Sequence, residues 1–360
     1  MKEWMGKLRS LLVLGSIVLV LSACGRDNLT ALVPKGYGAD ISMKLIILTT
    51  VVMTFVFIVV MILMVIVLLR YRKKKGDKVI NPEQVEGNKM LETVWTIIPI
   101  ILVVIMAVPT IFATFHLAES KDAADHINID VTGNQYWWHF DYQNEEISTS
   151  QDIYVPANKK VYLHLNSNDV IHSFWVPSIT GKLDVNPENE NTMYIEAYEE
   201  GVYYGKCAEL CGPSHSLMDF KLIVVSEEEY DQWVADMQDF DSEELDLDGA
   251  AVDGEELFDD KGCISCHATD TQNYSAGSVP QGPDLTQFGD RTNLAGVFPM
   301  EKEEIVNWIQ DPESMKPGNK MTGAYDPVDD EEADKIADYL LELQPSDVTP
   351  EDKEVKNEDE

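Results

Sequence analysis

The residues with the clearest chemistry in this 360-residue chain lie in the segment K-C-A-E-L-C-G-P-S-H-S-L-M, residues 206–218. Within it, Cys207, Cys211, His215 and Met218 offer two thiolates, one imidazole and one thioether. Such a soft ligand set favours copper over hard cations. Zinc also accepts cysteine and histidine, but methionine is a poor zinc ligand. A disulfide between Cys207 and Cys211 is the alternative, which an oxidising compartment permits.

A second motif, Cys263-Ile-Ser-Cys266-His267, has the spacing at which a c-type haem is attached to a protein. The two thiols add across the haem vinyl groups, and the adjacent histidine is placed to ligate the iron. A redox disulfide or half of a zinc site would also use a C-x2-C pair. Neither of them predicts the histidine, and the sequence has no further C-x2-C pair that could complete a zinc site.

An iron atom held by His267 needs another axial ligand from elsewhere in the chain. Histidine–methionine ligation raises the potential of c-type cytochromes, which suits a late stage of an electron-transfer chain. Met321, in K-P-G-N-K-M, lies on a Pro/Gly loop before a predicted helix over 336–343, and it is our preferred ligand. Met315 is an alternative, whereas we assign Met300 to packing.

The N-terminal residues predict export from the cytoplasm. Basic residues precede an apolar run over 11–21 that ends in L-S-A-C. A basic start, a short apolar run and small residues before a cleavage point are typical of a secretory signal. The cysteine directly after Leu-Ser-Ala resembles a bacterial lipobox, which implies removal of a signal peptide over 1–23 and a lipid on Cys24. A signal sequence or an uncleaved anchor with an incidental cysteine is the alternative, and either one also predicts export.

Residues 24–118 predict a transmembrane hairpin. The apolar stretch 45–69 would form a helix of about 37 Å, which is enough to cross a hydrocarbon core of about 30 Å, and 91–117 predicts a second span. Basic residues at 70–75 place the connecting loop in the cytoplasm, so the rest of the chain lies on the outer face. Glu92 stands at the edge of the second span, where a carboxyl is costly and often functional; an interfacial glutamate is the alternative.

The charge of the chain is strongly acidic and unevenly distributed. The net charge is −36 for the whole sequence, composed of +6 over residues 1–118 and −42 over residues 119–360. This balance excludes ordinary nucleic-acid binding, which needs a basic surface to neutralise phosphates. The acidic exterior could attract a basic partner, or it could suit saline or alkaline surroundings.

Residues 119–228 predict an all-β domain. Apolar and polar residues alternate over 127–131 and 161–165, and Gly, Pro and Asn turns separate the short apolar runs. This pattern is typical of a sandwich or barrel. The predicted fold is therefore a multidomain membrane protein in which a two-helix hairpin precedes the β domain.

The remaining residues predict a helix with an acidic linker over 229–253, a helical domain over 254–344 and a disordered acidic tail over 345–360. Ser226 and Glu229 form a capping box before the first of these helices. The helical domain contains the haem motif, and its periodicity predicts an all-α fold.

Taken with an upstream segment, D-V-I-H-S-F-W-V-P, these features resemble subunit II of the haem–copper cytochrome c oxidases, whose cupredoxin-like domain carries binuclear copper A. The resemblance covers residues 24 to about 240 and includes the aromatic run G-N-Q-Y-W-W-H-F-D-Y. It implies two coppers bridged by Cys207 and Cys211. His172 and His215 would be terminal ligands, and Met218 would be an axial ligand.

The resemblance also implies that Glu209 provides a backbone carbonyl to copper and that its side chain meets a magnesium ion shared with subunit I. Glu92, in L-E-T-V-W-T-I-I-P, matches the carboxylate at the start of a proton path into subunit I. The sequence departs from the family at Tyr136, where a tryptophan usually accepts electrons from cytochrome c. Either Trp137 takes this role or the route differs.

Residues 250 to about 344 resemble a class I cytochrome c, with G-P-D-L at 282–285 implying that the Pro283 carbonyl orients the haem-ligating histidine. The family resemblances together predict an oxidase subunit II with a fused cytochrome c domain, in the plasma membrane of a bacterium. It would pass electrons from a cytochrome c donor, through its own haem c and copper A, to subunit I, which reduces oxygen and pumps protons; further membrane subunits are also expected. The alternatives are the copper A subunit of a nitric oxide reductase and a free-standing membrane-anchored electron-transfer lipoprotein. A quinol oxidase subunit II would lack the copper ligands.

Overall fold

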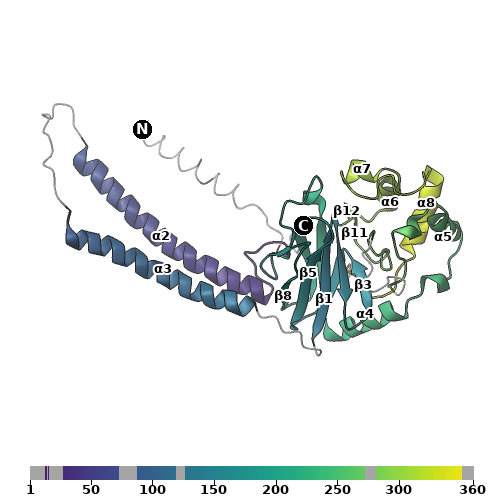
Figure 1. Ribbon diagram of the computed structural model, residues 1–360, viewed down its shortest axis with the longest axis horizontal. Helices are drawn as coiled ribbons and strands as arrows, with labels where there is room; N and C mark the ends of the chain where they lie inside the picture. The colour runs from purple at the N-terminus through teal and green to yellow at the C-terminus, as the bar shows by residue number, and fades with distance from the viewer. Residues whose placement is uncertain are drawn as a thin grey trace.

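The computed structural model describes residues 13, 15, 27–72, 87–118, 126–271 and 281–350. They form a long helical hairpin, a β domain and a helical domain, in that order along the longest axis of the molecule (Figure 1). The predicted succession of fold classes is therefore confirmed. The predicted lipid site, Cys24, lies outside the described residues, as does nearly all of the predicted signal peptide.

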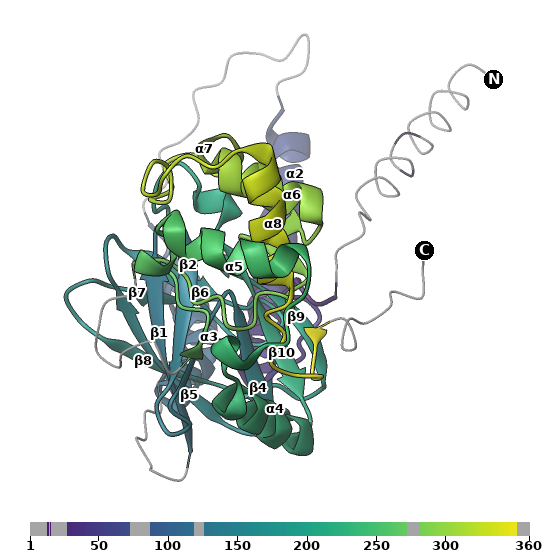
Figure 2. The same ribbon diagram turned by 90° about the vertical axis from the view of Figure 1, so that its right-hand side faces the viewer.

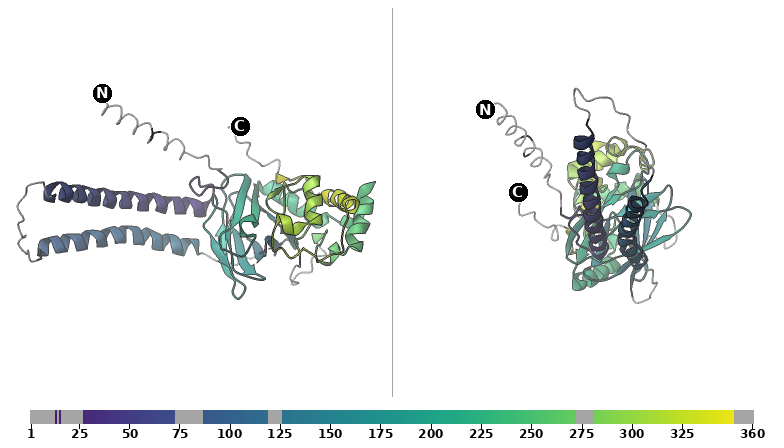
Figure 3. Two further views of the ribbon diagram at one scale, coloured as in Figure 1. Left: turned by 90° about the horizontal axis from the view of Figure 1, so that it is seen from above. Right: turned by 90° about the vertical axis from the view of Figure 1, so that its left-hand side faces the viewer.

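The hairpin consists of the helices α2, Tyr37–Tyr71, and α3, Lys89–Leu117. Both are long and apolar enough to cross a membrane. They run antiparallel and project from one side of the β domain, opposite the helical domain (Figure 3). Asn88 caps α3, because its side chain accepts hydrogen bonds from the backbone N–H groups of Met90 and Leu91 at 3.0 and 3.2 Å.

Helix α2 begins earlier than the predicted span because its first turn docks on the β domain. The backbone N–H of Tyr37 donates to the carbonyl of Glu196 at 2.9 Å, and that of Ala39 donates to the carbonyl of Ile179 at 3.0 Å. Gly36 permits this approach, since a Cβ there would lie 2.6 Å from the Ile179 oxygen. The base of the hairpin is thus attached directly to the β domain.

The β domain is a sandwich of two five-stranded sheets, with strand orders β3-β2-β1-β5-β8 and β4-β10-β9-β6-β7. The strands are β1 Ile127–Asn134, β2 Trp137–Tyr142, β3 Ile147–Ser150, β4 Asp152–Pro156, β5 Val161–Ser167, β6 His172–Trp175, β7 Leu183–Val185, β8 Asn191–Ile195, β9 Gly201–Cys207 and β10 Asp219–Val225. A short 3-10 helix, η1 (His215–Leu217), precedes β10. Strand β1 pairs in parallel with β5, and β4 pairs in parallel with β10. The chain between each pair passes through the other sheet before it returns.

Apolar side chains fill the space between the sheets, as the period-two pattern predicts. Helix α4, Glu227–Asp239, closes the sandwich at one side and inserts Trp233, which is 1% exposed. The indole stacks on the Tyr154 ring with centroids 4.5 Å apart. The predicted capping box of Ser226 and Glu229 is present at the start of this helix.

The helical domain contains α5 Ala250–Asp260, α6 Lys302–Gln310, α7 Pro312–Met315 and α8 Asp330–Leu341, with the 3-10 helices η2 Ser242–Glu244 and η3 Cys263–Ser265 and the short strands β11 Asn293–Leu294 and β12 Phe298–Pro299. Figure 2 looks onto this domain and shows α5, α6 and α8 gathered in front of the β domain. Helices α5 and α8 approach closely at Gly254, where a Cβ would lie 2.1 Å from the Lys335 carbonyl oxygen.

The predicted acidic linker and tail pack more closely than their charge suggests. Phe240, Leu245 and Leu247 are partly buried against the core of the helical domain. At the other end, the Ser346 hydroxyl donates to Asp236 of α4 at 2.6 Å, and Val348 packs against the core of the β domain. The prediction of disorder from residue 345 is therefore wrong for residues 345–350, because the few apolar residues among the acidic ones find a partner surface. Residues 351–360 lie outside the described residues.

Candidate copper and haem centres

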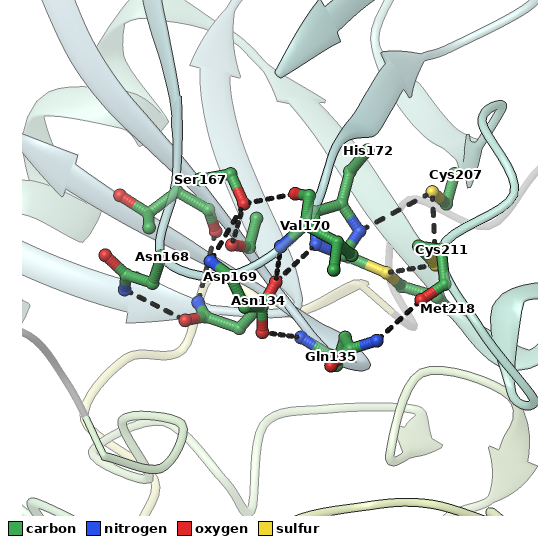
Figure 4. Close-up of polar contacts among 12 residues, drawn as sticks. Asn134, Gln135, Ser167, Asn168, Asp169, Val170, His172, Cys207, Cys211 and Met218 are labelled. Atoms are coloured by element: carbon green, nitrogen blue, oxygen red, sulfur yellow. Dashed lines mark hydrogen bonds and ion pairs between the residues drawn. The ribbon is translucent and has the colours of Figure 1, made fainter. Parts of the chain in front are cut away.

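The predicted copper ligands come together at one end of the β sandwich. Cys207 ends β9 and Met218 directly precedes β10, so antiparallel pairing of these strands closes the loop that holds Cys211 and His215. His172 begins β6, the other neighbour of β9, and its side chain is fully buried. Sheet pairing therefore brings a histidine distant in sequence to the cysteine loop (Figure 4).

Donor atoms in this cluster lie 3.3 to 3.9 Å from the two sulfur atoms. Cys207 Sγ lies 3.9 Å from His172 Nδ1 and 3.3 Å from the Glu209 carbonyl oxygen. Cys211 Sγ lies 3.6 Å from His215 Nδ1 and 3.8 Å from Met218 Sδ. The two sulfurs are 3.9 Å apart and both cysteines are free, so the alternative of a disulfide is not found.

This donor set fits copper. Two central thiols carry, on one side, an imidazole and a carbonyl and, on the other, an imidazole and a thioether. The nearest three ligand atoms, from His172, Cys207 and Cys211, lie within 4.8 Å of one another and belong to buried residues. Soft sulfur and imidazole donors in a water-excluded site select copper over hard cations. The Glu209 side chain is exposed, whereas its carbonyl faces the sulfur.

The two thiols of the pair differ in acidity. The Cys211 thiol, together with the His172 imidazole, holds the pKa of Cys207 far below its usual range. The pKa of Cys211 is raised in turn, because its proton is shared with the adjacent sulfur and its burial opposes ionisation. The low pKa of Cys207 favours its thiolate, which is the metal-binding form of cysteine.

Asp169 orients the His172 ring. Its Oδ1 lies 2.8 Å from His172 Nε2, which leaves Nδ1 directed at Cys207. Burial opposes ionisation of Asp169, but hydrogen bonds from His172 and from the backbone of Gln135 and Val170 hold its pKa well below the usual range. A carboxylate on the distal nitrogen is a common means of fixing the tautomer of a metal-ligating histidine.

The haem-motif residues line a single pocket in the helical domain. Cys263, Cys266, His267 and the distant Met321 all belong to its walls. Apolar residues of the domain complete the lining, including Phe258, Leu285, Leu294, Trp308, Ile336 and Leu340. Cys263 and Cys266 are both free. Burial raises the pKa of Cys263 to about 11.

His267 is prepared to bind a metal through one nitrogen. Its Nδ1 donates a hydrogen bond of 2.8 Å to the Pro283 carbonyl, which leaves Nε2 as the free lone-pair donor. Burial lowers the pKa of His267 and so favours the neutral ring that ligates a metal. Gly282 makes room for the ring, because a Cβ there would lie 2.8 Å from His267 Cε1.

Two further observations test the fit of a haem. Met300 and Met315 pack against the core of the helical domain, whereas Met321 lines the pocket. Arg291 also lines the pocket and is 7% exposed. Its Nε is buried and has no hydrogen-bond partner among the described residues. The pocket therefore offers an apolar space with a buried cation, which matches a porphyrin that carries carboxylates.

Residues of the β domain also line this candidate haem pocket. Gln135, Tyr136 and Trp137 contribute to its wall, although they belong to β2 and the residues before it. Gln135 Nε2 donates to the Cys211 carbonyl at 2.6 Å. Gln135 thus touches both the pocket and the loop between β9 and β10, which we call the copper loop. Tyr136 and Trp137 both border that pocket.

Contacts across the two domains are polar and largely buried. The Ser148 backbone N–H donates to Thr271 Oγ1 at 2.7 Å, and the Asp284 backbone N–H donates to Ser150 Oγ at 2.9 Å. The Ser214 hydroxyl, within the copper loop, donates to the Pro317 carbonyl at 2.7 Å. These contacts place the helical domain over the copper end of the sandwich.

Glu92 lies apart from both centres. It is exposed in the first turn of α3, at the end of the hairpin that is remote from the β domain. Sequence reasoning did not single out Asp169, Gln135 or Arg291. Only Asp169 carried a usable signal, since it stands three residues before His172.

Known protein families match all three parts of the chain. The profile described as "Cytochrome C oxidase subunit II, transmembrane domain" matches residues 42–112. "Cytochrome C oxidase subunit II, periplasmic domain" matches residues 145–227, and "Cytochrome c" matches residues 251–344.

Two relatives that span nearly the whole chain have the same name. Cytochrome c oxidase subunit 2 of Bacillus subtilis (strain 168) is 42% identical over 95% of this chain and 98% of its own length. The protein of the same name from Bacillus sp. (strain PS3) is 45% identical over 91% of this chain and 95% of its own length. Quinol oxidase subunit 2 of Bacillus cereus (strain ATCC 14579) is 32% identical over 66% of this chain and 82% of its own length.

Proposed function

The chain belongs to the cytochrome c oxidase subunit II family, and on that premise we propose that it is the electron-accepting subunit of a bacterial haem–copper oxidase. It receives electrons from a cytochrome c donor and passes them to subunit I, where oxygen is reduced to water and protons are pumped. A covalent haem c and a binuclear copper A would supply reversible one-electron transfer.

The observation that carries this proposal is the junction of the two donor sets. Cys263, Cys266, His267 and Met321 line one pocket, and residues that contact the copper loop form part of the same wall. Gln135 joins the two through its hydrogen bond to the Cys211 carbonyl. This arrangement favours the order haem c, copper A, subunit I. Tyr136 and Trp137 both border the route.

The residues of each centre have defined tasks. Cys207 and Cys211 would hold the coppers through their thiolates, with His172, His215, Met218 and the Glu209 carbonyl as the remaining ligands. Burial and hydrogen bonding fix the His172 ring. A rigid ligand set needs little rearrangement when the charge of the metal changes, which favours fast electron transfer.

Residues of the haem site follow the same logic. Cys263 and Cys266 would hold the haem covalently, and His267 would ligate the iron through Nε2, because the Pro283 carbonyl occupies Nδ1. Met321 would be the other iron ligand, and the buried Arg291 would offer its Nε to a haem carboxylate.

The membrane arrangement extends the proposal. The two helices span the plasma membrane with the β and helical domains on the outer face, because the basic residues after α2 favour the cytoplasmic side. Cys24 carries a lipid after removal of the signal peptide. The first turn of α2 and the last turn of α3 both adjoin the β domain (Figure 3). A chain that crosses the membrane twice and keeps its later domains on one face would have this arrangement.

Contacts with subunit I involve two glutamates. The exposed Glu209 side chain is free to share a magnesium ion at the interface. Glu92, exposed in the first turn of α3, contributes the carboxylate at the start of a proton path. The exposed apolar surface of α2 and α3 is available for subunit I and for further membrane subunits.

The test is purification of the native complex, followed by metal analysis and oxygen uptake. We expect two coppers in this chain, one covalent haem in this chain, and cyanide-sensitive oxygen consumption with reduced cytochrome c. Cys211→Ser should abolish copper binding and turnover, whereas Ser216→Ala, an exposed neighbour in the same loop, should change neither. Nitric oxide consumption in place of oxygen consumption would support the reductase alternative, and isolation of the chain without any haem–copper partner would support a free-standing lipoprotein.

A further inference from the structure

Lys320 links the loop between α7 and α8, which also carries Met321, to the copper site. It directly precedes Met321, and its Nζ lies 3.0 Å from Asp169 Oδ2. The other oxygen of the same carboxylate, Oδ1, contacts Nε2 of the copper ligand His172 at 2.8 Å. A continuous polar chain therefore runs from a lysine of one domain to a metal ligand of the other.

The Asp169 carboxylate is held rigidly between these two contacts. Its side chain is 12% exposed. Besides His172 and Lys320, it accepts hydrogen bonds from the backbone N–H groups of Gln135 and Val170, each at 2.8 Å (Figure 4). Since all four groups contact one carboxylate, a change of charge at one group alters the strength of the hydrogen bonds to the others.

The loop that carries Lys320 also covers the copper loop. Ser214 donates to the Pro317 carbonyl at 2.7 Å. A Cβ at Gly318 would lie 3.4 Å from the Tyr136 hydroxyl and 3.5 Å from Pro213. The position of Lys320 over Asp169 is therefore fixed by neighbouring contacts and does not depend on the ion pair alone.

We propose that Lys320 is a positioning residue that raises the reduction potential of the copper centre from within the haem domain. This inference rests on the proposed function. A carboxylate on the distal nitrogen increases the basicity of a ligating imidazole and so stabilises the oxidised metal. The ammonium of Lys320 withdraws charge from that carboxylate and weakens this effect. Docking of the haem domain thereby makes copper a better electron acceptor for the haem that the same loop ligates.

The effect is modest in size, because the Lys320 side chain is 59% exposed and is screened by water. We expect Lys320→Gln to shift the equilibrium for electron sharing between haem and copper about threefold toward the haem. A threefold shift corresponds to about 28 mV at about 59 mV per tenfold for one electron. Because Lys320 also lines the haem pocket, the copper potential should fall by this amount relative to the haem potential.

The experiment is a redox titration of the purified holo-complex in which haem and copper are followed separately by optical and electron paramagnetic resonance spectra. Lys320→Arg should restore the wild-type copper potential. Lys302→Gln is the matched control, because it removes the same charge from the same domain, where Lys302 pairs only with Asp334 and Asp338 among the salt bridges of the described residues.

Three results would overturn the inference: an unchanged copper potential in Lys320→Gln, an equal shift in Lys302→Gln, or a shift confined to the haem. A wild-type complex that lacks either centre would instead refute the proposed function, so the two failures are distinguishable.

Discussion

Gly282 is the position at which a single methyl group should most clearly disturb the haem site. A Cβ there would lie 2.8 Å from His267 Cε1 and 3.0 Å from His267 Nδ1. Ordinary carbon–carbon contacts are about 3.5–4.0 Å, so Gly282→Ala requires the imidazole to retreat by about 0.7 Å. The ring is held on that side by its 2.8 Å hydrogen bond to the Pro283 carbonyl.

The expected energetic cost follows from these contacts. Overpacking of a filled site costs about 1–3 kcal/mol, and loss of one hydrogen bond costs about 1 kcal/mol. Replacing glycine by alanine recovers about 0.4–1 kcal/mol by restricting the unfolded chain. The haem domain should therefore lose about 1–3.6 kcal/mol, which at about 4–8 °C per kcal/mol lowers its Tm by about 4–29 °C.

Haem absorption followed against temperature in the detergent-solubilised complex measures this effect. Gly181→Ala is the control, because a Cβ at Gly181 meets nothing within 4 Å, and its Tm should equal that of the wild type. If Gly282→Ala melts with the wild type and retains the same axial-ligand spectrum, the proposed seating of His267 against Gly282 and Pro283 is incorrect.

Three further predictions concern the two cores and the axial ligand. Trp233→Ala removes the indole that stacks on Tyr154 at 4.5 Å and should destabilise the β domain by about 3–5 kcal/mol in denaturant unfolding; a loss below about 1 kcal/mol would contradict its role in the core. Burial raises the pKa of Asp290 to about 7, so the stability contributed by its protonated form is present at about pH 4 and is lost as the pH rises to about 7. In thermal unfolding across this pH range, the Tm of Asp290→Asn should change less with pH than the Tm of the wild type. An equal change of Tm with pH in both proteins would contradict this role of Asp290. Met321→Ala should lower the haem potential and allow carbon monoxide to bind the reduced haem, whereas Met315→Leu should do neither; the reverse result would reassign the ligand.

The local parts of both centres were predictable because their residues lie close together in sequence. Cys207 to Met218 span twelve residues, and Cys263 to His267 span five. Their types alone indicate soft-metal and haem chemistry. His172 was predicted only through the family resemblance, since its approach to Cys207 depends on the pairing of β6 with β9.

Features that depend on packing between distant segments could not be predicted. The Lys320–Asp169 pair joins residues 151 positions apart, and no local pattern reports such a contact. The early start of α2 at Tyr37 and the packing of Val348 likewise depend on surfaces that exist only after the β domain has folded. Charge and apolar periodicity describe one segment by itself, so they could predict neither the start of α2 nor the packing of Val348.

The order of electron transfer is the central claim, and a one-electron pulse delivered to the fully oxidised complex tests it most directly. With haem and copper absorbance recorded together, we predict that the haem is reduced first and is then reoxidised as copper is reduced, at a rate independent of the concentration of the complex. Reduction of copper before the haem, or a haem that stays reduced while copper and oxygen turnover proceed, would contradict the account.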